Sequence, residues 1–181
     1  MFATIYLPNF YLQAALRHQS ELCVKPVALI DDKDKKAVII QLNKAAEAAG
    51  LHKGMTPSQG LARCLGLIIK TRTRSQEKLI DKILLHYAFT LAPYVEAAAP
   101  GICTIQFTDN RNLGPKLLRV IKQLAECEIK AQAGISPTPD ASLLVAHLAR
   151  PVLQIEDAKQ FLAPLPIETL AISTRSTIDR R

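Results

Sequence analysis

The chain has 181 residues, of which 49% are apolar, so it can form a hydrophobic core with a small appended subdomain, and disorder is excluded. No uninterrupted apolar run approaches the roughly 20 residues of a transmembrane helix, which argues against a membrane protein. The four cysteines lie far apart without a CxxC pair. This spacing predicts neither a metal site nor a disulfide framework, and it favours a reducing cytoplasm.

Most of the net charge of +7 comes from one early part of the chain. Residues 14–74 contain 11 lysine or arginine residues and 5 acidic residues, whereas the rest of the chain contains 12 and 11. A one-sided basic surface suits a polyanion such as nucleic acid. A solvated surface that maintains solubility fits the same charge equally well, so both interpretations stay open.

The first 70 residues predict a strand followed by a compact mixed segment. The expected elements are a strand over 2–7, a helix over 10–17, a hairpin of strands over 27–30 and 37–42, a helix over 44–49, a helix from 57 to about 65 and a strand over 67–70. Pro8 and Asn9 end the first strand. Thr56 and Gln59 have the spacing of a capping box, with Pro57 in the first turn, and therefore mark a helix start.

The remaining residues predict a regular alternation of helices and strands. The expected elements are a long helix after 76, strands over 94–98 and 102–107, a helix over 115–125, a strand over 129–133, a helix from 139 to about 150 and a short helix over 157–162. The long helix is amphipathic. If the segment after the first strand is set aside, the order is that of a split β-α-β unit, which predicts an α+β sheet covered by helices on one face.

Five short segments follow one another in an order that is typical of a known family. They are Lys25–Ala28, Ala49–Met55, Pro93–Glu96, Ala133–Pro137 and Phe161–Ile167. In sequence and spacing they resemble motifs of the Y-family (translesion) DNA polymerases. The matching family motifs are the Lys-Pro-Val-Ala strand and the Phe-Gly-Val-Arg-x-Gly-Met turn of the fingers, the Pro-x-Val-Glu segment, the Gly-Ile-Ala-Pro turn and the Phe-Leu-x-x-Leu-Pro-Val run.

The resemblance implies a division of the chain. It predicts a palm-like domain over 1–13 and 75–165, a fingers-like insertion over 14–74 and the start of a thumb over 166–181. The implied fold class is α+β, with a ferredoxin-like split β-α-β palm and an inserted small α/β fingers subdomain. The thumb and little-finger domains that bind DNA in the family are not in this sequence, so the chain resembles a palm and fingers alone.

The resemblance also marks the positions at which the family binds metal ions. The first strand of the family ends in Asp-Met-Asp-x-Phe-Phe, and Tyr6 stands at the position of the metal-binding aspartate. The family's Ser-x-Asp-Glu-Ala corresponds to Ala99–Cys103, with Gly101 and Ile102 in place of the two acids. Nucleotidyl transfer uses two divalent cations held chiefly by carboxylates. We therefore expect no catalytic residue, no metal and no cofactor, and Mg²⁺ only if the protein is an active but atypical enzyme.

The phosphate-binding positions of the family are only partly basic here. The triphosphate-binding Tyr and Arg of the fingers correspond to Lys44 and Glu47, and a carboxylate would repel a triphosphate, so no nucleotide site is expected. Four basic residues are expected to contact DNA phosphates: Lys70, Arg72, Arg74 and Arg150. The first three alternate along an extended segment and should share one face. The last precedes a proline, as a lysine of the family does.

These substitutions resemble the ImuB-type branch of the family, which keeps the polymerase frame without catalytic residues. The resulting interpretation is a non-enzymatic scaffold of translesion synthesis and SOS mutagenesis that binds DNA, weakly for this fragment. Its expected partners are the sliding clamp, an accessory mutagenesis protein and a separate error-prone polymerase, in the bacterial cytoplasm at the nucleoid. Two alternatives stay open: an active but atypical DNA-directed nucleotidyltransferase that uses Asp109 or another acid, and a protein-interaction module without DNA affinity.

Overall fold

A computed structural model describes residues 1–31 and 37–170. They belong to two compact units, one formed by Met1–Pro8 and the chain from Asp81 onwards, the other by Asn9–Ile80. The chain therefore passes from one unit to the other at 8/9 and at 80/81. The sequence predicted these boundaries at 13/14 and 74/75. Residues 32–36, between the two strands of the predicted hairpin, and most of the predicted thumb start over 166–181 lie outside the described residues.

A five-stranded sheet forms the centre of the first unit. Its strands are β1 (Phe2–Tyr6), β5 (Tyr94–Ala99), β6 (Ile102–Gln106), β7 (Gln132–Ser136) and β8 (Val152–Gln154), in the order β5-β6-β1-β7-β8. The central strand, β1, pairs antiparallel with both β6 and β7, and β8 runs parallel to β7. This arrangement confirms the predicted α+β fold class with a split β-α-β palm.

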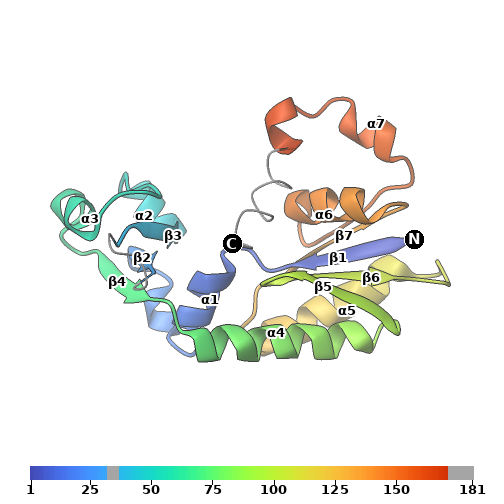
Figure 1. Ribbon diagram of the computed structural model, residues 1–181, viewed down its shortest axis with the longest axis horizontal. Helices are drawn as coiled ribbons and strands as arrows, with labels where there is room; N and C mark the ends of the chain where they lie inside the picture. The colour runs from blue at the N-terminus through green and yellow to red at the C-terminus, as the bar shows by residue number, and fades with distance from the viewer. Residues whose placement is uncertain (32–36, 171–181) are drawn as a thin grey trace. The chain divides into compact units, whose positions relative to one another are not determined.

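Helices cover both faces of this sheet. The helices α4 (Arg74–Phe89) and α5 (Leu113–Glu126) lie on one face, and α6 (Pro139–Leu148) lies on the other (Figure 1). The expectation of helices on a single face is therefore wrong. Because α6 connects the parallel neighbours β7 and β8, it has to cross over one face of the sheet, and α4 and α5 already cover the other. Two short helical segments, α7 (Ala158–Leu162) and η2 (Ile167–Leu170), follow β8.

The approach of α6 to the sheet depends on a glycine in β7. A Cβ atom added to Gly134 would lie 2.2 Å from the backbone nitrogen of Ala146 and 2.4 Å from the carbonyl oxygen of Ser142. Only a residue without a side chain allows the helix backbone to pack this close to the strand. The strand itself begins later than the alternation over 129–133 predicts, because the amide of Ile129 donates to the carbonyl of Leu124 and closes the end of α5.

The second unit is a smaller α/β fold around a three-stranded sheet in the order β3-β2-β4. Its elements are α1 (Phe10–Leu16), η1 (Ser20–Leu22), β2 (Val27–Ile30), β3 (Ile39–Leu42), α2 (Lys44–Ala48), α3 (Pro57–Arg63) and β4 (Ile68–Thr71). The predicted hairpin is β2 with β3, and β4 joins it parallel to β2. The capping box of Thr56 and Gln59 forms as predicted.

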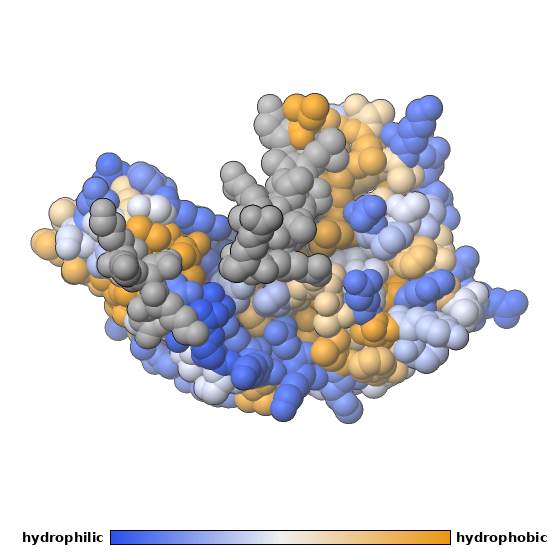
Figure 2. All heavy atoms as spheres, viewed as in Figure 1, coloured by the Kyte–Doolittle hydropathy of each residue, from blue (hydrophilic) through white to orange (hydrophobic). Residues whose placement is uncertain are grey.

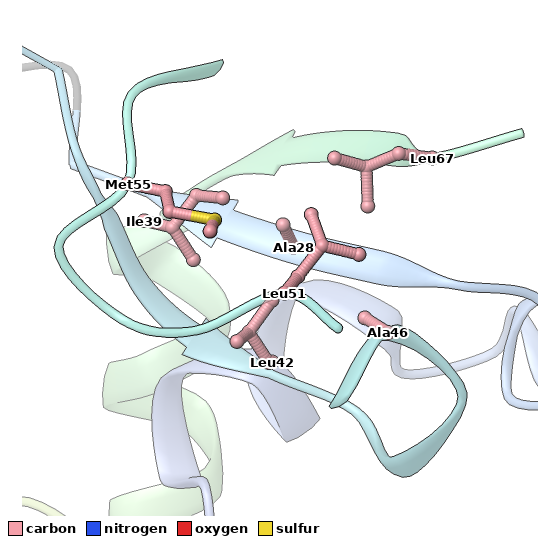
Figure 3. Packing of buried hydrophobic residues seen from close by; sticks show 7 residues of the cluster. All are labelled: Ala28, Ile39, Leu42, Ala46, Leu51, Met55 and Leu67. Carbon is pink, nitrogen blue, oxygen red and sulfur yellow. The ribbon is translucent and has the colours of Figure 1, made fainter. Parts of the chain in front are cut away.

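Buried aliphatic side chains close one face of this small sheet. The cluster consists of Ala28, Ile39, Leu42, Ala46, Leu51, Met55 and Leu67 (Figure 3). Its members come from all three strand regions and from α2, so the second unit has a hydrophobic core of its own.

Hydrophilic residues gather over much of the outer side of α4, as expected for an amphipathic helix (Figure 2). No helix in the described part of the chain combines the length and apolarity needed to cross a bilayer.

We predict that Gly134→Ala destabilises the protein by at least about 2 kcal/mol, because the added methyl group would overlap the backbone of α6. Urea unfolding followed by circular dichroism measures this loss. The matched control is Gly114→Ala on α5, whose added Cβ would meet only the side-chain oxygen of Gln154 at 3.9 Å. Equal stability of the Gly134→Ala variant and the wild type would contradict the close packing of α6.

Candidate active site

The end of β1 brings together the three positions that the family resemblance marked. Tyr6 lies opposite Ile102 in the antiparallel register of β1 and β6. The next residue, Leu7, donates its amide hydrogen to the carbonyl oxygen of Gly101 at 2.9 Å. Tyr6, Gly101 and Ile102 therefore meet at one end of the sheet, where the turn between β5 and β6 closes.

A carboxylate that the sequence analysis did not single out holds this turn. Gly101 has a φ of 73°, a conformation that favours glycine, and its amide donates to Oδ1 of Asp81 at 2.9 Å. Asp81 lies on α4, directly after the buried Ile80. Together with Pro100, Ile102 and several small apolar residues, it lines a surface pocket beside the turn. No sequence motif surrounds Asp81. Its place next to the buried side of an amphipathic helix was the one feature of the sequence that could have pointed to it.

On the face covered by α6, two aromatic rings occupy the end of β1. The rings of Tyr6 and His147 are tilted by 39°, with centroids 3.9 Å apart. Burial raises the pKa of the Tyr6 hydroxyl and lowers the pKa of His147 to about 4. Both side chains are therefore uncharged at neutral pH.

Buried, uncharged hydroxyl groups lie further along β1, beneath α6. The hydroxyl of Thr4 lies 3.1 Å from that of Thr104 on β6 and 2.7 Å from that of Ser142 on α6. Ser142 also donates to the carbonyl oxygen of Pro139. These contacts satisfy the buried hydroxyls within the protein, and no charge accompanies them.

Asp109, the acid named for the enzymatic alternative, lies elsewhere. It follows the far end of β6, where the amide of Phe107 donates to the carbonyl oxygen of Met1 at the start of β1. Its carboxylate accepts from the amide of Arg111 at 3.0 Å. The length of the sheet therefore separates Asp109 from the turn at Gly101, and Asp81 is the acid beside that turn.

The basic residues predicted to bind phosphates differ in their surroundings. Lys70 donates to the side-chain oxygen of Gln19 at 2.8 Å. Arg150 is exposed and donates to the carbonyl oxygen of Ala149 at 2.7 Å. The two positions aligned with triphosphate contacts, Lys44 and Glu47, are both exposed on α2.

Arg72 instead forms the centre of an ion-pair network inside the second unit. It makes two hydrogen bonds to Glu77, at 2.7 and 2.9 Å, and one to Asp31 at 3.0 Å. Its guanidinium lies 3.7 Å from the ring centroid of Tyr11. Arg74 pairs with the same Asp31 at 2.9 Å but is more exposed. A phosphate could bind Arg72 only at the cost of these contacts, so of the two arginines Arg74 is the more accessible.

Comparison with known proteins places the chain in a family. Residues 5–147 match the model of the impB/mucB/samB family. The chain belongs to this family. It is 22% identical to DNA polymerase IV of Ralstonia nicotianae and 24% identical to that of Actinobacillus pleuropneumoniae serotype 3, each over 170 residues that cover 89% of the chain. Both alignments cover 48% of the relative, so the chain spans about half the length of these polymerases.

Solved structures with the same fold include Y-family polymerases. DinB from Sulfolobus solfataricus matches with a TM-score of 0.78 and 16% identity, over 93% of this chain and 52% of that chain. A post-insertion binary complex of Dbh DNA polymerase matches with a TM-score of 0.80 and 18% identity, over the same shares. The predicted resemblance to a Y-family polymerase fragment is thus confirmed. Membership of the ImuB-type branch stays a prediction.

The expectation that the protein is not an enzyme is contradicted by these relatives, which are DNA polymerases IV. That expectation rested on the absence of acids at the positions of Tyr6, Gly101 and Ile102. The structure brings Asp81 to the same turn from a helix that no sequence motif connects with it. Acids can therefore reach this part of a family member from outside the motif positions.

The motif positions themselves do not fit a pair of divalent cations. Such cations prefer carboxylate oxygens, and Tyr6, Gly101 and Ile102 supply none. Within residues 1–31 and 37–170, no group of three or more His, Cys, Asp and Glu side chains could hold a metal ion. Asp81 is a single carboxylate that already accepts from Gly101.

We predict that Asp81→Ala loosens the turn at Gly101 and destabilises the protein by about 1.5–3 kcal/mol, since a buried amide loses a charged acceptor. Asp81→Asn is the matched control, because it keeps a side-chain oxygen at the same place and should lose less. Urea unfolding and hydrogen exchange of the Gly101 amide measure both effects. Unchanged exchange in the Ala variant would show that the contact does not hold the turn.

We also predict that His147 makes the protein less stable in mild acid. In the unfolded chain the imidazole binds a proton near pH 6.5, whereas in the folded protein its pKa is about 4. Lowering the pH from 7 to 4.5 should therefore cost the wild type about 1–2 kcal/mol more than it costs His147→Leu, after allowance for partial exposure. Urea unfolding at both pH values tests this, and parallel pH profiles would contradict it.

Proposed function

We propose that this chain is the palm and fingers of a Y-family DNA polymerase that acts on primed DNA in translesion synthesis. The match of residues 5–147 to the impB/mucB/samB family carries the proposal. The polymerase IV relatives and the complexes of Dbh polymerase with the same fold support it. Because the chain spans about half of these relatives, its activity and its DNA binding both belong to the proposal.

The basic residues supply a way to hold the DNA backbone. We propose Lys70, Arg74 and Arg150 as phosphate contacts, because their charges are accessible or weakly engaged. Arg72 is assigned to the ion-pair network that ties β4 to α4. Each phosphate contact releases counterions, so it adds to the salt dependence of binding whatever the DNA sequence.

We propose nucleotidyl transfer to DNA in an atypical form. No cofactor is assigned to Tyr6, Gly101 and Ile102, because these residues lack the carboxylates that Mg²⁺ requires. Acids at other positions would have to serve, and Asp81 is the first to test because it lies at the turn beside β1. The proposal extends to the partners of an SOS mutagenesis system: the sliding clamp, an accessory mutagenesis protein and a separate error-prone polymerase, at the bacterial nucleoid.

Two measurements test the proposed function. In fluorescence anisotropy, the chain should bind primed DNA at low salt and lose affinity as salt rises. Lys70→Ala, Arg74→Ala and Arg150→Ala should each reduce the slope of log affinity against log salt by up to about 1. The control is Lys122→Ala, which removes the same charge from the exposed side of α5. In primer extension with Mg²⁺ or Mn²⁺, the full-length protein should add nucleotides according to the template.

Each readout has a contradicting result. A flat anisotropy signal at low salt would favour a protein-interaction module without DNA affinity. If the three variants and the Lys122→Ala control have equal salt slopes, the assignment of Lys70, Arg74 and Arg150 as phosphate contacts is wrong. If the full-length protein does not extend a primer with either cation, the proposed activity is refuted, but the proposal of DNA binding is not affected.

A further inference from the structure

An aromatic pair, Tyr6 and His147, lies at the end of β1. Tyr6 lies between Ile102 of β6 and Gln132 of β7 in the sheet register, and its ring packs on His147 of α6. Both rings are only partly buried. The pair thus combines a core-like position with a face that solvent or a ligand can reach.

One polar atom of this pair lacks a partner. The Nε2 atom of His147 is buried and makes no hydrogen bond in the described part of the protein. A buried polar atom without a partner is unfavourable, so a shift of the ring that exposes Nε2 to a hydrogen-bonding ligand would remove the penalty. The buried hydroxyls of Thr4 and Ser142 bond to each other.

The surroundings of the pair select the chemistry of a ligand. At neutral pH Tyr6 is un-ionised and His147, whose pKa burial lowers to about 4, is unprotonated, so neither ring carries a charge that would attract a phosphate. The sheet neighbours of Tyr6 are the uncharged Ile102 and Gln132. A flat, neutral group with hydrogen-bonding edges fits such a site, and in DNA that group is the base.

We infer that Tyr6 and His147 form a stacking site for a nucleobase of primed DNA at the end of β1. The inference rests on the proposed function, which supplies the DNA. It adds a contact of a different kind from Lys70, Arg74 and Arg150, since stacking contributes affinity without releasing counterions. The aromatic pair and the basic residues should therefore be separable by their response to salt.

The test uses primed DNA that carries 2-aminopurine, whose fluorescence is quenched when the base stacks. Tyr6→Leu and His147→Leu keep apolar bulk but remove the ring, and each should weaken binding about five-fold to one-hundred-fold without changing the salt slope. In both variants the change in 2-aminopurine fluorescence that accompanies binding should also be lost. Tyr6→Phe keeps the ring and should stay within about three-fold of the wild type.

The control is Tyr94→Leu, which removes an exposed tyrosine from β5 of the same sheet and should leave both signals unchanged. Thermal unfolding checks that each variant folds, and if Tyr6→Leu does not fold, His147→Leu decides. Wild-type affinity and fluorescence in the ring-removing variants overturn the inference while the proposed function stands. A reduced salt slope in these variants also overturns it, because the contact would then be to phosphate. Absence of DNA binding by the wild type overturns both.

Discussion

The pairing of β1 with two neighbours at once holds the first unit together and positions its candidate site. β1 exchanges backbone hydrogen bonds with β6 on one side and with β7 on the other, and its residues Ala3 and Ile5 are fully buried. Side chains alternate along a strand, so this register turns Thr4 and Tyr6 toward α6. A slip by one residue would exchange the faces and remove both residues from α6.

The packing of α6 follows from that register. Gly134 of β7 lets the helix backbone approach the sheet, and this approach brings Ser142 to Thr4 and His147 to Tyr6. Burial between α6 and the sheet reinforces the neutral character of the pair, since it raises the pKa of Tyr6 and lowers the pKa of His147. On the opposite face, α4 contributes the carboxylate that holds the turn.

In the second unit, charges that look alike in the sequence have different roles. Arg72 and Arg74 both reach Asp31, yet only Arg72 also has two short bonds to the buried Glu77 and lies over an aromatic ring. The alternation of basic residues in the sequence cannot distinguish a cation held inside the protein, such as Arg72 after β4, from a more exposed one, such as Arg74 at the start of α4. The basic excess of residues 14–74 is accordingly only partly available to DNA.

The sequence by itself determined most of the order of the elements, but not β8 or η1, and it determined the hairpin of β2 and β3, the capping box of Thr56 and Gln59 and the family. These features depend on side-chain periodicity and on contacts between near neighbours in the chain, which a single sequence displays. Only the tertiary structure decided that Asp81 meets Gly101, that Tyr6 packs on His147 and that helices cover both faces of the sheet. Such contacts join residues far apart in the chain, and they exist because strand register and helix packing bring those residues together.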